Sequence, residues 1–168
     1  MLAGLTQRRS IRSFSPQQIT QEELYAVLQA GMYAPTARGK QSPVIVVIQK
    51  PEEIQAVAGL NRLFTYMPDP YYSAPTILIV LVPKEAPWGM LDGAAVLTNL
   101  CNGAYAAGLG SCWINRPQFM FETQEGKNML KRWGLTGHWV GVGSVALGYA
   151  NGAPPEPLPR KKDYCIFV

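Results

Sequence analysis

Three arginines stand close together near the start of the chain, in the stretch QRRSIRSF at residues 7–14. Arg8, Arg9 and Arg12 surround Ser10 there. Guanidinium groups this close repel one another, and each can hold a phosphate through two parallel hydrogen bonds. The stretch is therefore either a solvated basic turn or a binding site for an anion, and a short charged motif does not by itself decide between the two.

A second basic cluster near the other end of the chain consists of Arg160, Lys161 and Lys162. The two clusters hold six of the 15 Lys and Arg residues, although the net charge is only +4 and the pI about 9.0. Such focused charge favours a small anionic ligand over a broad nucleic-acid surface. Two arginine-bearing segments from opposite ends of the chain would be able to enclose one phosphate.

Few residues are available for other kinds of catalysis. The chain has one histidine, His138, and three cysteines without a C-x-x-C pair, namely Cys101, Cys112 and Cys165. These do not make a metal site, and we expect buried, reduced thiols. The glycines of GVGSVALG (141–148) lack dinucleotide-fold spacing and lie in a strand pattern. Any demanding chemistry is therefore expected to come from a bound cofactor.

The elements that must position these residues follow from the hydrophobic pattern. Thr20 and Glu23 have the spacing of a capping box at the start of a helix. We expect helices at about 21–33, from Pro51 onward, at 91–108 (packed on all sides) and at 124–133. We expect strands at 44–49 and 76–82 (both buried), at 111–114 and at 139–149. Segments 34–43 and 60–73 are expected to be loops, the second one functional.

The composition is that of a globular protein. Of 168 residues, 48% are hydrophobic and 15% charged, and no repeat or linker divides the chain. We therefore expect a single domain over 1–168. The apolar runs are too short to span a membrane, and the first residues do not read as a signal peptide. These features predict a cytoplasmic protein that binds neither membrane nor nucleic acid.

The last segment, ANGAPPEPLPRKKDYCIFV (150–168), is rich in proline and cannot form a packed helix. We expect an extended arm. It ends in the apolar residues Tyr164, Ile166, Phe167 and Val168. Little of the chain remains to cover them, so we expect the arm to add to a second subunit.

Four segments together resemble the nitroreductase family of FMN-dependent NAD(P)H oxidoreductases, and they cover nearly the whole chain. They are RRSIRSF (8–14), APTARGKQSP (34–43), DGAAVLTNLCNGAYAAGLGSCWI (92–114) and VALGYANGAPPEPLPRK (145–161). The resemblance implies an α+β fold, in which helices flank a central mixed β-sheet. It also implies a homodimer with FMN at the subunit interface and a C-terminal arm that crosses to the partner.

The resemblance also assigns site residues. Arg8, Arg9, Ser10 and Arg12 match the family's FMN phosphate and ribityl segment, and Arg160 and Lys161 match basic residues that close on the same phosphate. Pro35, Thr36 and Ala37 match a loop laid against the flavin from the other subunit, with Gly39 where many members have Asn. Asn115 and Arg116 match residues whose backbone N–H groups face flavin N5 and O4. Asn61 is a further candidate for the pyrimidine edge, and no catalytic side chain is implied.

The expected activity is hydride transfer from NAD(P)H to the flavin and then, by a ping-pong mechanism, to a nitroaromatic or quinone-like acceptor. Neither the physiological acceptor nor a preference for NADH or NADPH follows from the sequence. Two alternatives stay open: a dehalogenase or flavin-cleaving relative of the same family, and a small basic nucleic-acid-binding domain. The candidates for stacking against a flat substrate are Tyr71, Tyr72, Trp88 and Phe119.

Overall fold

The computed structural model describes residues 2–168. Its helices are α1 (Leu2–Gln7), α2 (Gln21–Met32), α3 (Pro51–Arg62), α4 (Gly89–Ala106), α5 (Pro117–Met120) and α6 (Gln124–Arg132), with short 3-10 turns η1 (Ala37–Gly39) and η2 (Lys162–Tyr164). Its strands are β1 (Val44–Ile48), β2 (Thr76–Pro83), β3 (Gly110–Ile114) and β4 (Trp139–Gly148). Every element predicted from the sequence is present within a few residues of its expected bounds. The two helices not predicted, α1 and α5, are too short to show a helical period.

The four strands form one sheet in the order β1-β2-β4-β3, with every neighbouring pair antiparallel. The predicted α+β class is confirmed. The four strands are antiparallel rather than mixed, and the parallel pairing among the described residues is an isolated bridge between Ser10 and Ser111. An apolar run reveals a buried strand but not its direction, which depends on how the chain returns through the intervening helices.

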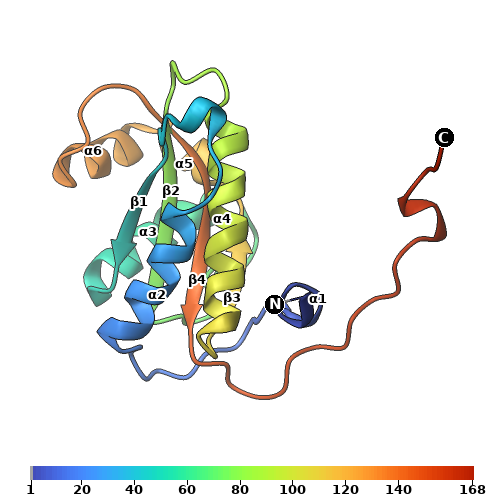
Figure 1. The fold of residues 1–168 in the computed structure, drawn as a ribbon. Coiled ribbons are helices and arrows are strands. Elements are labelled where there is room, and N and C mark those ends of the chain that lie inside the picture. The colour runs from blue at the N-terminus through green and yellow to red at the C-terminus, as the bar shows by residue number, and fades with distance from the viewer. Residues whose placement is uncertain (1) are drawn as a thin grey trace.

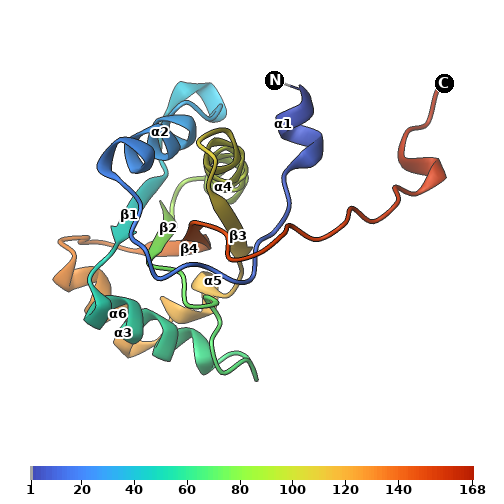
Figure 2. The same cartoon turned by 90° about the horizontal axis from the view of Figure 1, so that it is seen from below.

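Helices cover both faces of the sheet (Figures 1 and 2). Helices α2 and α4 lie on one face, and α3, α5 and α6 lie on the other. The alternation of β2 separates two hydrophobic clusters: Ile77 and Ile79 pack with the α3 side, and Leu78 and Val80 pack with the α2 and α4 side. Burial on both faces explains why β2 reads as a continuous apolar run.

Two elements are less buried than the sequence predicts. β1 is an edge strand with Val47 37% exposed, because β2 covers only one of its sides. α4 leaves Met90, Leu91 and Thr98 exposed, so it is not packed on all sides. Conversely, the expected functional loop 60–73 carries a core residue, since Tyr71 is 1% exposed.

The C-terminal segment is an extended arm that leaves the body of the molecule (Figures 1 and 2). All residues from 151 to 168 are exposed, including Ile166, Phe167 and Val168. The extended conformation that the prolines predict is thus observed, and no residue between 2 and 168 covers its apolar end. Between residues 2 and 168, no helix has the length and apolar character needed to cross a membrane.

Candidate functional site

The arginine-rich stretch runs along the open edge of the sheet. The backbone N–H of Ile11 donates to Ser111 O of β3 at 2.9 Å. Further on, the N–H of Asn151, at the root of the arm, donates to Ser13 O at 2.9 Å. Residues 8–14 therefore lie between the edge strand β3 and the point where the arm begins.

The three arginines are used differently. Arg9 Nη1 donates to Thr6 O and to Arg8 O, both at 2.8 Å, so its guanidinium is turned back onto the local backbone. Arg8 is half-buried and lines a hollow of about 400 Å³ with Tyr105, Gly110 and the root of the arm. Arg12 is exposed.

Within the described part of the chain, none of these arginines has an acidic partner. Over residues 2–168, the ion pair within 4 Å is the one between Arg132 and Glu125, at 3.5 Å, on α6. Arg8 and Arg12 thus keep uncompensated positive charge beside β3. Such a site is suited to an anion, because a phosphate would relieve the repulsion between the guanidiniums and accept their hydrogen bonds.

Two buried cysteines lie beneath the arginines. Burial raises the pKa of Cys101 and of Cys112, and the positive charge of Arg8 opposes the rise in both. Their thiols are therefore protonated at neutral pH and serve as small packing groups. Across the described residues, no group of three or more His, Cys, Asp or Glu side chains is arranged to hold a metal ion.

The loop that carries Pro35, Thr36, Ala37 and Gly39 is anchored by a residue that sequence reasoning missed. The N–H of Ala37 donates to Asp92 Oδ1 at 2.9 Å, and Asp92 is 7% exposed in the first turn of α4. Gly39 has φ +64°, a backbone conformation that glycine adopts without strain. An acidic residue in the first turn of a helix can be recognised from the sequence, but its hydrogen bond to a distant loop cannot.

This loop and the arginines lie at opposite ends of α4. Asp92 contacts the loop at one end, and Tyr105 lines the arginine hollow at the other. The helix rise of 1.5 Å per residue separates these two positions by about 20 Å. Figure 1 shows η1 and α1 at opposite ends of the helix. In the single chain, the loop therefore lies well apart from the phosphate-binding segment.

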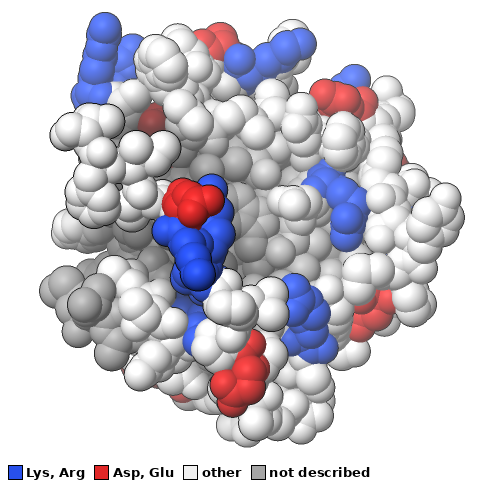
Figure 3. Space-filling model, turned by 90° about the vertical axis from the view of Figure 1, so that its right-hand side faces the viewer, with Lys and Arg blue, Asp and Glu red and all other residues white. Residues whose placement is uncertain are grey.

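The basic residues of the arm are also apart from Arg8. Arg160 and Lys161 are exposed on the arm, and the Lys161 ammonium lies 5.5 Å from the Tyr164 ring centroid, within the arm itself. Figure 3 shows the side of the molecule from which the arm extends, where Lys and Arg form separate groups with acidic residues among them. Among the described residues, Arg160 and Lys161 make no hydrogen bond or ion pair with the phosphate-binding segment.

The segment after β3 brings together Asn115, Arg116 and Asn61. Arg116 has a positive φ of +87°, and its Nε donates to Asn61 Oδ1 at 3.1 Å. Asn61 is fully buried, with 0% exposure. Its amide is therefore committed to holding this segment from inside and does not reach the surface, contrary to the expected pyrimidine-edge contact.

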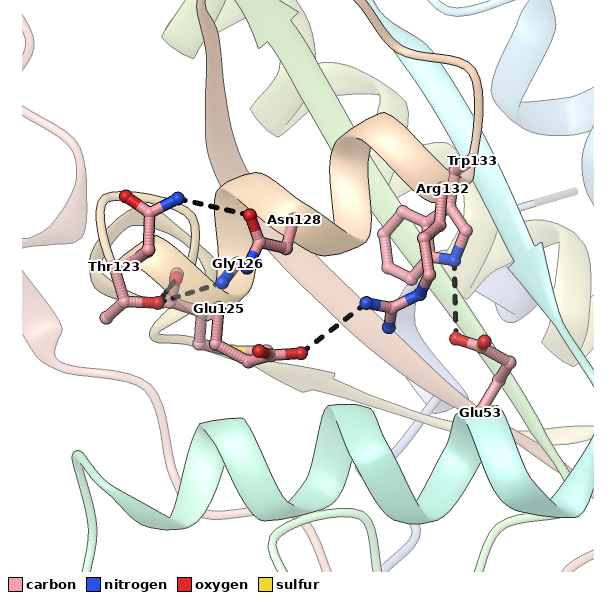
Figure 4. Close-up of polar contacts among 9 residues, drawn as sticks. Glu53, Thr123, Glu125, Gly126, Asn128, Arg132 and Trp133 are labelled. Carbon is pink, nitrogen blue, oxygen red and sulfur yellow. Dashed lines mark hydrogen bonds and ion pairs between the residues drawn. The ribbon is translucent and has the colours of Figure 1, made fainter.

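The far end of the same segment is fixed by the start of α6 (Figure 4). The Thr123 hydroxyl donates to Met120 O at 2.6 Å and accepts from the N–H of Gly126 at 3.0 Å. At the end of α6, Trp133 Nε1 donates to Glu53 Oε2 of α3 at 3.3 Å. Residues 115–123 are thus held at both ends by secondary structure on one face of the sheet.

The aromatic residues expected to stack on a substrate differ in availability. Tyr71 is buried and cannot stack; it was not recognised as core because the prolines around it read as a loop. Tyr72 is half-buried, and Trp88 is exposed at the start of α4, where it lines a hollow with Arg38 and Asp92. Phe119 is 51% exposed close to residues 115–116 and packs on Phe64, with ring centroids 5.9 Å apart.

Comparison with known proteins identifies relatives over the whole fold. The model of the Nitroreductase family matches residues 5–64 and 66–149. A curated protein of Archaeoglobus fulgidus, described as a putative NADH dehydrogenase/NAD(P)H nitroreductase, is 28% identical over 147 residues, which are 84% of this chain and 80% of that protein.

Two solved structures are also similar. A nitroreductase with bound FMN from Bacteroides fragilis has a TM-score of 0.89 and 27% identity, and the match covers 99% of this chain and 97% of that one. A nitroreductase with bound FMN from Desulfitobacterium hafniense has a TM-score of 0.85, 22% identity and full coverage of both chains. The second likeness establishes the fold.

Proposed function

Because the chain belongs to the nitroreductase family, we propose that it is a single-domain, FMN-dependent oxidoreductase that takes hydride from NAD(P)H and passes it to a nitroaromatic or quinone-like acceptor. One observation carries the proposal. Arg8 lies at the start of the edge strand β3, beside Gly110, and the Asn115–Arg116 segment follows the other end of the same strand. A strand of this length keeps the anion-binding end of the proposed site apart from the end that donates backbone hydrogen bonds.

The residues present fit FMN. Arg8 and Arg12 supply positive charge without acidic partners, as a phosphate requires. Neither Asn115 nor Arg116 donates its backbone N–H to another protein group within residues 2–168. Two unpaired donors at the far end of β3 match the acceptor atoms on the edge of a flavin ring. Arg9 has a supporting role, since its guanidinium orders the backbone of Arg8.

When bound, FMN supplies the hydride chemistry, oxidising NAD(P)H in one half-reaction and reducing the acceptor in the next, as in a ping-pong mechanism. The chain's own residues bind and orient. Arg8 and Arg12 would hold the phosphate, the N–H groups of Asn115 and Arg116 would hold the ring edge, and Phe119 would limit access beside it. No side chain is required to carry a proton in this scheme.

The site is completed by a second copy of the chain. The loop 35–39 lies about 20 Å along α4 from the arginines, and Arg160 and Lys161 extend away on the arm. In a homodimer, the partner would supply the loop and cover the apolar end of the arm. This arrangement explains why one chain leaves Ile166, Phe167 and Val168 in solvent.

The purified protein is therefore expected to be yellow with a flavin spectrum, or to become so when FMN is added. NADH or NADPH without oxygen should then bleach it, and a nitroaromatic or quinone should restore the colour. Riboflavin, which lacks the phosphate, is the matched control and should bind more weakly. A colourless protein that takes up no FMN would rule the proposal out.

A further inference from the structure

Asn61 is a polar residue at a position where the fold would ordinarily place an apolar one. It lies near the end of α3 with 0% exposure, next to Leu60 of the hydrophobic core. Its Nδ2 lies 3.3 Å from each of three acceptors, Asn115 O, Tyr71 Oη and Met120 Sδ. A buried amide is costly unless it is hydrogen-bonded, so these contacts are what make the residue tolerable there.

The two ends of this amide hold two adjacent residues, Asn115 and Arg116. While Nδ2 donates to the carbonyl of Asn115, Oδ1 accepts from Arg116 Nε at 3.1 Å. Arg116 has φ +87° and ψ −10°, a left-handed conformation that a residue with a Cβ adopts only when its surroundings impose it. The Asn61 side chain holds this turn in place from the core.

The preceding peptide group, between Ile114 and Asn115, is held in the same way. The Ser144 hydroxyl, with 0% exposure on β4, donates to Ile114 O at 3.3 Å and shares a 3.1 Å hydrogen bond with Tyr71 Oη. Tyr71 in turn contacts Asn61. One buried network therefore binds the carbonyls of two consecutive peptide groups, at Ile114 and Asn115.

Because the peptide bond is planar, the direction of each of these carbonyls fixes the direction of the N–H group that follows it. In a trans peptide the N–H points opposite to the preceding C=O. Because the carbonyls of Ile114 and Asn115 point to buried donors, the N–H groups of Asn115 and Arg116 point away from the core. Neither donates to protein within residues 2–168, although most buried or ordered backbone donors find a partner.

We propose that Asn61 is a positioning residue, which, with Tyr71 and Ser144, orients the Asn115 and Arg116 N–H groups toward the edge of the flavin ring. The inference rests on the proposed FMN site. Asn61 does not touch the flavin; it acts by fixing two peptide planes. Donors oriented in advance stabilise negative charge at the ring without reorganisation, so the network raises the midpoint potential of bound FMN.

The first test is Asn61→Leu, which preserves approximate volume and removes every amide contact without adding charge. The matched control is Asn99→Leu, since Asn99 is a half-buried asparagine whose Nδ2 donates to Ala30 O at 3.0 Å between α4 and α2. We expect Asn61→Leu to retain FMN, to shift its absorption bands and to make its midpoint potential more negative. Anaerobic reduction by NAD(P)H should slow about tenfold or more, and Asn99→Leu should match the unmodified protein.

The second test covers the case in which Asn61→Leu fails to fold. Arg116→Ala and Arg116→Gly both remove the guanidinium, but only glycine accepts φ +87° without strain. We expect Arg116→Gly to keep a midpoint potential closer to that of the unmodified protein than Arg116→Ala does. Equal potentials for this pair, or an unshifted potential and spectrum in folded Asn61→Leu, would overturn the inference. An unmodified protein that binds no FMN would instead refute the proposed function.

Discussion

The backbone N–H of Ala37 donates a 2.9 Å hydrogen bond to Oδ1 of Asp92, a residue 55 positions later in the first turn of α4. This contact ties an otherwise irregular loop to the longest helix of the fold. Asp92 is 7% exposed, so little water is available to replace it. The loop that we propose to meet the partner's FMN is therefore positioned by one buried carboxylate.

Replacing that carboxylate should loosen the loop. Asp92→Ala leaves the Ala37 N–H without its acceptor, which costs about 1–3 kcal/mol of unfolding free energy. FMN affinity should fall with it. Urea unfolding and FMN titration measure the two effects. Glu52→Ala is the control, because Glu52 is exposed in the first turn of α3 and should change stability by no more than about 0.5 kcal/mol. Unchanged FMN affinity in Asp92→Ala would contradict the assignment of the loop.

The arginines should contribute unequally to FMN retention. Arg8→Ala is expected to weaken FMN binding roughly 10- to 100-fold, which corresponds to the loss of about 1.5–3 kcal/mol from a charged hydrogen bond. Arg9→Ala should weaken it less, because its guanidinium already bonds Thr6 O and Arg8 O. Fluorescence titration with FMN provides both values. Arg132→Ala, on α6, serves as the control, and an Arg8→Ala protein that binds FMN normally would refute the phosphate assignment.

Removal of the arm should separate the subunits. A chain that ends at Gly152 lacks Arg160, Lys161 and the apolar residues beyond them, all of which are exposed here. We expect it to be monomeric by light scattering and to lose FMN, because the partner's loop no longer reaches the site. The full-length variant Phe167→Ser is the control, and it should weaken the dimer less than the truncation does. A truncated chain that stays dimeric would show that the interface does not depend on the arm.

The start of α6 should not tolerate a side chain at Gly126. A Cβ there would lie 2.1 Å from Met120 O, in backbone that cannot move without disturbing the cap at Thr123. Gly126→Ala should therefore destabilise the protein by about 1–3 kcal/mol in urea unfolding. Gly59→Ala is the matched control. Its nearest neighbour would be the flexible Arg62 side chain at 3.7 Å, so alanine should instead stabilise α3 by about 0.5–1 kcal/mol.

The contact between Glu23 and Tyr149 should make stability depend on pH. The Tyr149 hydroxyl donates to Glu23 Oε2 at 2.7 Å, which lowers the pKa of Glu23 and raises the pKa of Tyr149. A lowered carboxyl pKa stabilises the fold above the ordinary value of ~4.3, and this contribution is lost as pH falls through the native pKa. A raised phenol pKa stabilises below ~10, and this contribution is lost as pH rises through the native value.

Tyr149→Phe removes the hydroxyl and keeps the ring. It should be less stable than the unmodified protein across the window between these two values, with the difference shrinking on the acid side. Thermal unfolding from pH 3 to pH 8 measures this. Tyr105→Phe is the control, because its hydroxyl donates to a neutral group, Gln7 Oε1, at 3.1 Å. A constant difference at all pH values would show that Glu23 is not the partner that matters.

Local chemistry in the sequence was enough to place most elements. The capping box of Thr20 and Glu23 starts α2 as predicted, and both of its hydrogen bonds form. The apolar run of β2 is buried on both faces, as its composition indicates. These features depend on residues a few positions apart, whose backbone preferences and periodicity are present in the chain before it folds. The arginine stretch, the extended arm and the family resemblance could likewise be recognised from the sequence alone.

Tertiary structure alone decided how the distant residues meet. One buried network beneath residues 115–116 joins Asn61, Tyr71 and Ser144. These residues come from three separate segments, and no sequence pattern predicts that they meet. The same is true of Asp92 beneath Ala37. A side chain's role in such contacts depends on the direction in which each element returns across the sheet, which is a property of the packed fold. The sequence thus determined where basic side chains gather, and the fold decided which buried groups hold the backbone of residues 114–116.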